Sequence, residues 1–386
     1  MKILHCCLAA FYIDNYSYQE NILPKMHKLQ GHDITILAST ETYISSAVLG
    51  YVKPSSYINR DGIPVTRIPY ISWLPHPIAK KLRIYKGINK FVTEFNPDII
   101  FLHDCQFIGI KEIVSFAKKN PQVKIYVDGH TDFINSARNW ISKNILHKII
   151  YKWCAKKIEP YTIKFYGVLP LRVEFFKKVY GIPSQKTELL LLGADHTMIE
   201  MSKRSEIRQS FRKKLNFKET DFVIVTGGKI DRRKNIHVLM KAVDQLQNEN
   251  IKLLVFGLPS DEMKSEIEAY RKSKFIKNIG WIPSEKTYDY LLVADIVFFP
   301  GTHSVLWEQA IGLGLPCVFK KWEGIQHVDL NGNCIFLENE DIPEIKEKIL
   351  KLYMDKKLLM SMKQVAEDRG TLEFSYYEIA KKAIEP

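Results

Sequence analysis

Two lysines and one glutamate follow predicted buried strands in the second half of the chain, and their types suit a sugar linked to phosphate. Lys229 and Lys234 flank a basic loop after the turn Gly227-Gly228. Glu308 lies one turn into a predicted helix that follows a second strand. Ammonium groups neutralise phosphate, whereas a carboxylate repels phosphate but accepts hydrogen bonds from sugar hydroxyls. Together these side chains suit a nucleotide-sugar diphosphate with its ribose.

The elements that must position these side chains are two units of strand, loop and helix. Asp295 to Phe299 is an apolar strand, a Pro-Gly pair breaks it, and helical spacing returns from Val305 to Gly312. Ser304 is the predicted N-cap of that helix. In an open parallel sheet such junctions meet at the carboxyl edge, where helix N-termini attract anions. The alternative for Asp231 to Lys234, a solvated surface loop, stays open.

The first half of the chain alternates strands with helices, which predicts an α/β domain with a doubly wound parallel sheet and ligands at its carboxyl edge. The predicted strands are Lys2 to Ala9, Asp33 to Ala38, Val65 to Ile68, Ile99 to Leu102 and Lys124 to Val127. The predicted helices are Gln19 to Leu29, Ala79 to Phe95 and Gln106 to Lys119.

Two polar clusters that contain histidine follow predicted strands in this half. His103-Asp104 comes after one strand, and the run Asp128-Gly129-His130-Thr131-Asp132 comes after the next. A carboxylate of Asp104 or Asp128 could hold the imidazole of His130 by a hydrogen bond. The alternative is structural, with His130 capping or bonding the next helix.

Length and composition indicate a globular protein of more than one domain. The chain has 386 residues, of which 46% are hydrophobic and 26% are charged. No apolar run approaches the length of a transmembrane helix. The start, MKILHCCLAAFYI, reads as a first strand because no small-residue cleavage site follows it. Six cysteines without metal or redox spacing predict buried, reduced thiols in a cytoplasmic protein.

Positive charge is concentrated in the first half of the chain. Residues 1–195 contain 26 Lys and Arg against 15 Asp and Glu, whereas the rest contains 30 against 28. From Arg138 to Lys157 there is no acidic residue, and basic residues alternate with apolar ones that include Trp140 and Trp153. This pattern predicts a basic amphipathic helix that docks on an anionic membrane. The alternative is a helix whose apolar stripe packs on the sheet while its lysines are merely solvated.

Three motifs in the second half resemble a known family. GGKIDRRKN, GWIPSEKTYDYLLVADIVFFPG and WEQAIGLGLPCVF, in this order and at these intervals, are similar to the donor half of retaining glycosyltransferases of family 4. The resemblance extends over nearly the whole chain. It implies a GT-B fold, with two Rossmann-like domains facing a central cleft.

The resemblance also implies roles for individual residues. Lys229 stands where the family usually has arginine, Lys234 is the diphosphate lysine, and Glu308 is the second glutamate of the Glu-x7-Glu motif. His130 is implied as the active-site histidine that contacts the transferred sugar near its anomeric carbon. The other expected donor-binding residues are Gly228, Ile282, His303, Ser304 and Val305, and the expected acceptor-side residues are Asn15, Tyr18, Gln19 and Asp104.

The sequence departs from the family pattern at two places. Pro300 occupies the position of the first glutamate, which in the family helps to hold the donor sugar. Asp14-Asn15 stands where the family usually has a glycine pair after the first strand. We therefore expect the loop after that strand to contact its ligands differently, through side chains.

The expected organisation is an acceptor-side domain (residues 1–195), a nucleotide-sugar-binding domain (196–370) and a C-terminal helix that crosses back (371–386). We expect transfer with retention from a UDP or GDP sugar to a glycan or lipid-linked acceptor, in bacterial cell-surface polysaccharide or lipopolysaccharide synthesis. The enzyme would be peripheral on the inner face of the cytoplasmic membrane, without metal, cofactor or nucleic acid. The alternatives are a catalytically degenerate basic module that binds membrane or nucleic acid, and a sugar-nucleotide epimerase.

Overall fold

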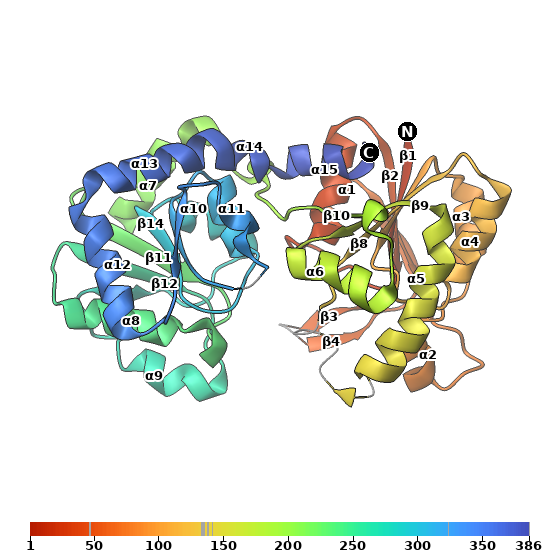
Figure 1. Ribbon diagram of the computed structural model, residues 1–386, viewed down its shortest axis with the longest axis horizontal. Helices are drawn as coiled ribbons and strands as arrows, with labels where there is room; N and C mark the ends of the chain where they lie inside the picture. Colours follow the sequence, from red (N-terminus) through yellow and green to blue (C-terminus); the bar gives the residue numbers. More distant parts are fainter. Residues whose placement is uncertain (46–47, 133–135, 137–138, 141, 323, 386) are drawn as a thin grey trace. The chain divides into compact units, whose positions relative to one another are not determined.

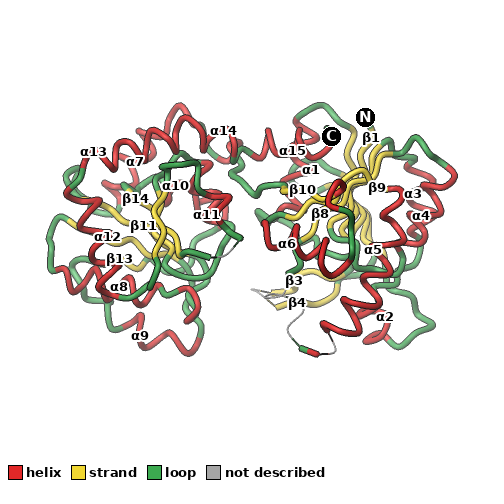
Figure 2. Tube along the Cα trace, viewed as in Figure 1, coloured by secondary structure: helices red, strands yellow, loops and turns green. Residues whose placement is uncertain are grey.

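The computed structural model describes residues 1–386 except 46–47, 133–135, 137–138, 141, 323 and 386 (Figure 1). It divides into two compact units: unit 1 comprises Met1–Leu191 with Ile379–Pro386, and unit 2 comprises Leu192–Glu378. In each unit, helices pack around a central sheet (Figure 2), so both are α/β domains as the sequence predicts. Within the described ranges, no helix is both long enough and apolar enough to span a membrane.

The sheet of unit 1 has eight strands among the described residues, in the order β10-β9-β8-β7-β1-β2-β6-β5. Neighbouring strands are parallel except β5 and β6. The central strands are buried on both faces, which explains their continuous apolar runs. The strands are β1 (Lys2–Cys7), β2 (Asp33–Ser39), β5 (Ser55–Ile58), β6 (Pro64–Ile68), β7 (Ile99–His103), β8 (Lys124–Gly129), β9 (Thr162–Gly167) and β10 (Thr187–Leu189), and β3 (Glu41–Ser45) with β4 (Val48–Tyr51) forms a separate antiparallel hairpin.

The helices of unit 1 confirm the prediction at α1 and correct it further along the chain. The single helix predicted from Ala79 to Phe95 is wrong, because Arg83 (φ 50°) and Gly87 (φ 97°) adopt left-handed conformations that end one helix and precede the next. The helix predicted from Gln106 begins only at Ile110. The helices are α1 (Gln19–Leu29), α2 (His76–Leu82), α3 (Ile88–Phe95), α4 (Ile110–Lys119), α5 (Lys152–Ile158) and α6 (Pro170–Phe175), with a π-helical segment Ser142–Tyr151 before α5.

The sheet of unit 2 is parallel throughout its described strands, in the order β13-β12-β11-β14-β15-β16. Its strands are β11 (Phe222–Gly227), β12 (Ile251–Phe256), β13 (Ile276–Asn278), β14 (Ile296–Phe299), β15 (Cys317–Lys320) and β16 (Cys334–Leu337). Its helices are α7 (Arg204–Lys214), α8 (Ile236–Leu246), α9 (Lys264–Glu268), α10 (Thr287–Leu291), α11 (Leu306–Gly312), α12 (Ile342–Met354), α13 (Lys356–Val365) and α14 (Thr371–Glu373), and α15 (Tyr376–Ile384) ends the chain in unit 1.

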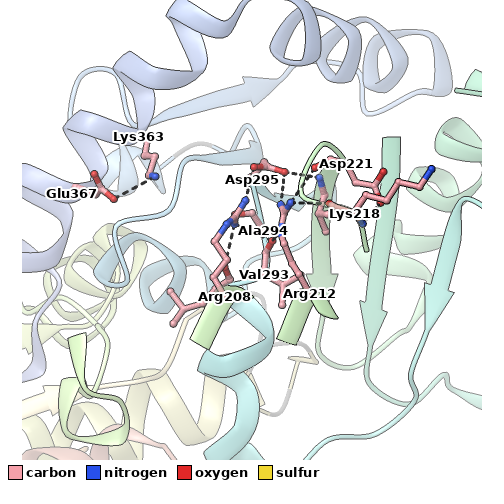
Figure 3. Close-up of polar contacts among 11 residues, drawn as sticks. Arg208, Arg212, Lys218, Asp221, Val293, Ala294, Asp295, Lys363 and Glu367 are labelled. Atoms are coloured by element: carbon pink, nitrogen blue, oxygen red, sulfur yellow. Dashed lines mark hydrogen bonds and ion pairs between the residues drawn. The ribbon is translucent and has the colours of Figure 1, made fainter. Parts of the chain in front are cut away.

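Two arginines of α7 attach this helix to the sheet of unit 2 through one carboxylate (Figure 3). Asp295, immediately before β14, accepts hydrogen bonds from Arg208 and Arg212, each at 2.6 Å, and from the backbone N–H of Val223 at 2.7 Å. Arg212 is almost fully buried and also donates to the carbonyl oxygen of Val293 at 3.1 Å. Because a buried guanidinium needs its counter-charge, Asp295 is central to the stability of this unit.

Replacing Asp295 by alanine should lower the free energy of unfolding by about 3 to 5 kcal/mol, because Arg212 would stay buried without its carboxylate. Urea denaturation measures the change. As a control, Asp261→Ala removes the partner of Lys264 from an exposed ion pair of 2.7 Å and should leave the urea midpoint unchanged. Equal midpoints for Asp295→Ala and the unmodified protein would contradict this role.

Candidate functional site

The strand order of unit 2 reverses between β11 and β14. From β11 the chain adds β12 and β13 on one side, and it then returns to add β14, β15 and β16 on the other. Connections leave such a pair of strands in opposite directions, so a crevice opens outside their carboxyl ends. The loops 228–235 and 300–305 follow β11 and β14 and therefore lie at this crevice. The predicted donor-binding residues, apart from Ile282 and Glu308, are all in these two loops.

Lys234 joins the two loops. Its Nζ donates hydrogen bonds to the carbonyl oxygens of Thr302 at 2.8 Å and His303 at 2.6 Å. Gly301 is essential to this approach, because a Cβ there would lie 2.3 Å from the backbone of Lys234. Burial lowers the pKa of Lys234 to about 8. An ammonium group has three donors, so Lys234 can hold the loop and still offer a charged N–H to an anion.

Glu308 lies in the first turn of α11 and is fully buried between two imidazoles. Its Oε1 accepts hydrogen bonds from Nε2 of His303 at 2.8 Å and from Nε2 of His327 at 3.0 Å. Burial alone would raise the pKa of Glu308, but His303 and then His327 outweigh it and lower the pKa to about 2. The carboxylate is therefore ionised.

The remaining predicted donor residues occupy different environments. Ser304 is not the N-cap, because α11 begins at Leu306 and Val305 takes the capping position without a side-chain bond. The Ser304 hydroxyl only accepts weakly from the N–H of Leu306, at 3.5 Å. Gly228 (φ 103°) makes the left-handed turn after β11, and the side chain of Lys229 is exposed. Ile282 is half-buried in the loop after β13, two strands away from β11.

Unit 1 has the same kind of reversal, between β1 and β7, and the predicted histidine clusters follow β7 and β8. Asp128 is fully buried, and its Oδ2 accepts from Nδ1 of His103 at 2.8 Å and from Nε2 of Gln19 at 3.1 Å. Its Oδ1 lies 3.4 Å from Nε2 of His130. Of the two carboxylates considered from the sequence, Asp128 is therefore the one beside the imidazole of His130.

Charge around His130 favours the imidazolium form. Burial alone would lower the pKa of His130, but the carboxylates of Asp128 and Glu20 outweigh it and raise the pKa to about 9. Asp104 accepts from the backbone N–H of His130 at 3.4 Å, and burial raises the pKa of Asp104 to about 6. The imidazolium of His130 is thus a partly exposed cationic donor that lies beside buried carboxylates.

The loop after β1 explains how the sequence does without the glycine pair. Asn15 has a φ of 64°, the left-handed conformation that glycine adopts most readily and asparagine tolerates. Asp14 forms an ion pair of 2.9 Å with the buried Arg67 and accepts a hydrogen bond from Tyr57 at 2.8 Å. Tyr18 precedes α1 at its N-cap position. Side-chain contacts therefore stabilise the conformation of this loop, which a glycine pair would usually make possible.

Within the described part of the chain, one group of side chains has the spacing of a metal site: His103, Asp128 and His130. Hydrogen bonds also explain why these side chains lie close together. Both ring nitrogens of His103 are already engaged, Nδ1 with Asp128 and Nε2 with Nδ1 of His5 at 3.0 Å. A metal that took His103 as a ligand would therefore have to replace one of these two hydrogen bonds.

Sequence reasoning missed His5 and His27, which continue this network. A signal existed, because His5 interrupts the otherwise apolar strand KILHCC. A fully buried histidine in a central strand must find partners for its ring nitrogens.

Known proteins resemble this chain in sequence and in fold. Residues 207–369 match the family model described as Glycosyl transferases group 1. An uncharacterized glycosyltransferase of Methanocaldococcus jannaschii is 20% identical over 337 residues, which cover 81% of this chain and 78% of the relative. The match to the family model contains both loops of the crevice in unit 2.

Solved structures resemble the whole chain. A glycosyltransferase from Rickettsia africae ESF-5 has a TM-score of 0.71 at 14% identity, covering 100% of this chain and 97% of that chain. Anabaena Alr3699/HepE in complex with UDP has a TM-score of 0.67 at 14% identity, covering 99% of this chain and 98% of that chain. The protein therefore has the GT-B fold, and its residues 207–369 match the family model of the glycosyl transferases group 1.

Proposed function

We propose that this protein is a retaining glycosyltransferase of family 4, which transfers a sugar from a UDP or GDP sugar to a glycan or lipid-linked acceptor. The observation that carries the proposal is that Lys234 and Glu308 both contact His303, beside the reversal of strand order in unit 2. A charged donor and a carboxylate at one crevice suit diphosphate and ribose respectively. The binding of UDP by the similar Anabaena protein supports a nucleotide-sugar donor.

In the proposed reaction, the departing nucleoside diphosphate acts as the base for the acceptor. Lys234, with the exposed Lys229, stabilises the charge that grows on the diphosphate as the glycosidic bond breaks. The diphosphate oxygen takes the acceptor proton on the same face of the sugar, which retains the anomeric configuration. His130, oriented by Asp128 in unit 1, donates a hydrogen bond to the sugar. Since the two lysines supply positive charge, we propose that the reaction needs no metal ion.

Incubation with a panel of nucleotide sugars and candidate acceptors tests the reaction class. Diphosphate release that depends on the acceptor, with the sugar found on the acceptor, is the expected result. Conversion of the sugar nucleotide into an epimer without transfer would instead support the epimerase. No turnover of any donor would support the catalytically degenerate module.

We further propose that the basic helix of unit 1 binds an anionic membrane, where a lipid-linked acceptor for cell-surface polysaccharide or lipopolysaccharide would be found. The described part of this helix, residues 142–158, buries His147, Tyr151 and Cys154 against the core. Trp140 is 70% exposed and Ile149 is 62% exposed, which is unusual for large apolar side chains. Arg138, the predicted start of the helix, lies outside the described residues.

The exposed apolar side chains share their face with lysines. Ile145, Ile149 and Trp153 recur every four residues and are exposed, so they lie along one side of the helix. Lys148 and Lys152 are also exposed and alternate with them. Apolar side chains that enter the headgroup region, flanked by lysines that attract anionic lipid, are the features of an interfacial helix. This favours docking over simple packing on the sheet.

The first activity prediction concerns Lys234. Lys234→Ala should reduce turnover by about 10² to 10³, since loss of one charge-stabilising donor costs about 3 to 4 kcal/mol in the transition state. Wild-type affinity for the nucleoside diphosphate should fall as the pH rises through about 8, where Lys234 loses its proton. Lys234→Arg should remove that pH dependence, because arginine stays charged.

Steady-state kinetics and calorimetry between about pH 6 and pH 10, on either side of the pKa of Lys234, measure both effects. The control Lys241→Ala changes an exposed lysine of α8 and should alter neither. An unchanged rate in a Lys234→Ala variant of normal thermal stability would rule out the role of this lysine.

The second prediction concerns Glu308. If its carboxylate accepts hydrogen bonds from the ribose, Glu308→Ala should weaken nucleotide affinity by about 1 to 3 kcal/mol, whereas Glu308→Gln should keep much of it. Calorimetry with UDP and GDP decides the point, with thermal unfolding measured alongside because Glu308 is buried. Equal affinity of the alanine variant and wild type would show that the carboxylate does not bind the ribose.

The third prediction concerns the basic helix. Changing Lys143, Lys148, Lys152 and Lys156 together to glutamine should reduce sedimentation with anionic vesicles at low salt, and added salt should weaken wild-type binding, because exposed charges are screened over roughly 8 to 10 Å. A control removes four exposed lysines of α3 and α4, namely Lys90, Lys111, Lys118 and Lys119. Equal sedimentation of the helix variant and wild type, or none for wild type, would contradict docking.

A further inference from the structure

Three buried histidines form a continuous hydrogen-bonded chain through the core of unit 1. His27, in α1, has Nε2 at 2.8 Å from the carbonyl oxygen of Ala380 in α15. Nδ1 of His27 lies 3.0 Å from Nε2 of His5 in β1, and Nδ1 of His5 lies 3.0 Å from Nε2 of His103 in β7. The chain ends where Nδ1 of His103 meets Oδ2 of Asp128 at 2.8 Å. The three imidazoles and Asp128 are all fully buried.

The number of protons in this chain follows from its two ends. A carbonyl oxygen and an ionised carboxylate can only accept, and each of the four hydrogen bonds needs a proton of its own. A neutral imidazole carries one such proton, so three neutral histidines supply only three of the four. The chain must therefore hold one additional proton, on a ring or on the carboxyl group.

The surroundings decide where the additional proton lies. Burial, more than neighbouring histidines, holds the pKa of His5 well below its usual range, and burial lowers the pKa of His27 to about 4. Only His103 is in contact with a carboxylate, and nearby imidazoles keep the pKa of Asp128 low although burial would raise it. A buried charge is tolerated when an opposite charge lies within hydrogen-bond distance.

We propose that His103 is an imidazolium that forms a buried ion pair with Asp128, and that the chain from Ala380 through His27 and His5 compels this state. The carbonyl oxygen at one end fixes the direction of each hydrogen bond. His27 must donate to Ala380, so it accepts from His5, and His5 in turn accepts from His103. His103 is left to donate from both nitrogens. The other charged groups near Asp128 are His130, Glu20 and Asp104.

This arrangement makes His5, His27 and His103 positioning residues for the site in unit 1. His103 and Gln19 occupy Oδ2 of Asp128, so that Oδ1 accepts from the backbone N–H of Asp104 at 3.3 Å and lies 3.4 Å from Nε2 of His130. The imidazolium also keeps Asp128 ionised, so that its charge supports the protonated form of His130. The effect on catalysis rests on the proposed function of His130, whereas the proton count rests on the hydrogen bonds alone.

Two substitutions of His27 separate the proton count from simple packing. His27→Gln can donate its amide N–H to Ala380 and accept from His5 with its amide oxygen, so His103 must still donate twice. His27→Leu fills the space but has no acceptor for His5. His5 can then donate to His103 instead, and His103 needs only the proton that it gives to Asp128. The glutamine variant should therefore keep the imidazolium, and the leucine variant should lose it.

Side-chain ¹⁵N NMR of the full chain labelled at histidine, at neutral pH, reads these states directly. Wild type and His27→Gln should show both nitrogens of His103 protonated, and His27→Leu should show only one. The control His32→Leu alters a histidine that packs against the ring of His27 without joining the chain, and its spectrum should match wild type at His103. If His27→Leu fails to fold, the wild-type and glutamine spectra still decide the proposal.

A singly protonated His103 in wild type would overturn the proposal, because the additional proton would then lie on Asp128. An imidazolium that persists in a folded His27→Leu variant would overturn the role of the chain. Transfer assays form a separate arm: His27→Leu should lower kcat by about 10- to 100-fold, typical of lost partners that orient a functional imidazole, and His27→Gln should restore most of it. If the NMR result holds but no transfer is found, the proposed function fails while the proton assignment stands.

Discussion

The reversal of strand order beside the first strand of each sheet is the constraint on which the rest of this structure depends. Because parallel strands are joined by crossovers, all their carboxyl ends lie at one edge, and the reversal opens a crevice there. In unit 2 it brings Lys234, in the loop after β11, against His303 in the loop after β14, and His303 in turn contacts Glu308 in α11. In unit 1 it does the same for the start of α1 and the carboxyl ends of β7 and β8, where Gln19, His103 and Asp128 meet.

Both crevices contain a buried carboxylate between two histidines. Asp128 lies between His103 and His130, and Glu308 lies between His303 and His327. Burial raises the free energy of an isolated carboxylate by far more than a domain's stability allows, so each must be paired or protonated. Pairing with imidazole also fixes the orientation of the histidine. The structure thus prepares ionised groups at each site before any ligand arrives.

Local sequence patterns predicted the core helices and strands well, but they failed where tertiary contacts determine the conformation or the partners of a side chain. The helix Gln19–Leu29 and the central strands follow from apolar periodicity, and the crevice residues follow from their place after strands. The break at Arg83 was missed because no local pattern marks its left-handed conformation, and its guanidinium bonds to the carbonyl oxygen of the distant Gln106. The histidine chain was missed because its members come from separate elements, and no spacing in sequence links His5 to His103. The contacts of the Glu308 carboxylate with imidazoles likewise could not be predicted from the sequence, because the fold brings these groups together.

The proposed binding of a nucleoside diphosphate at the crevice of unit 2 is tested most directly by hydrogen–deuterium exchange of the full chain with and without UDP or GDP. Bound diphosphate should hold the loops in place, so the account predicts slower amide exchange within residues 228–235 and 301–309, which follow β11 and β14. Exchange elsewhere in unit 2, for example in α12 (Ile342–Met354), should change little. Slower exchange confined to the loops of unit 1, or unchanged exchange at saturating UDP and GDP, would contradict the account.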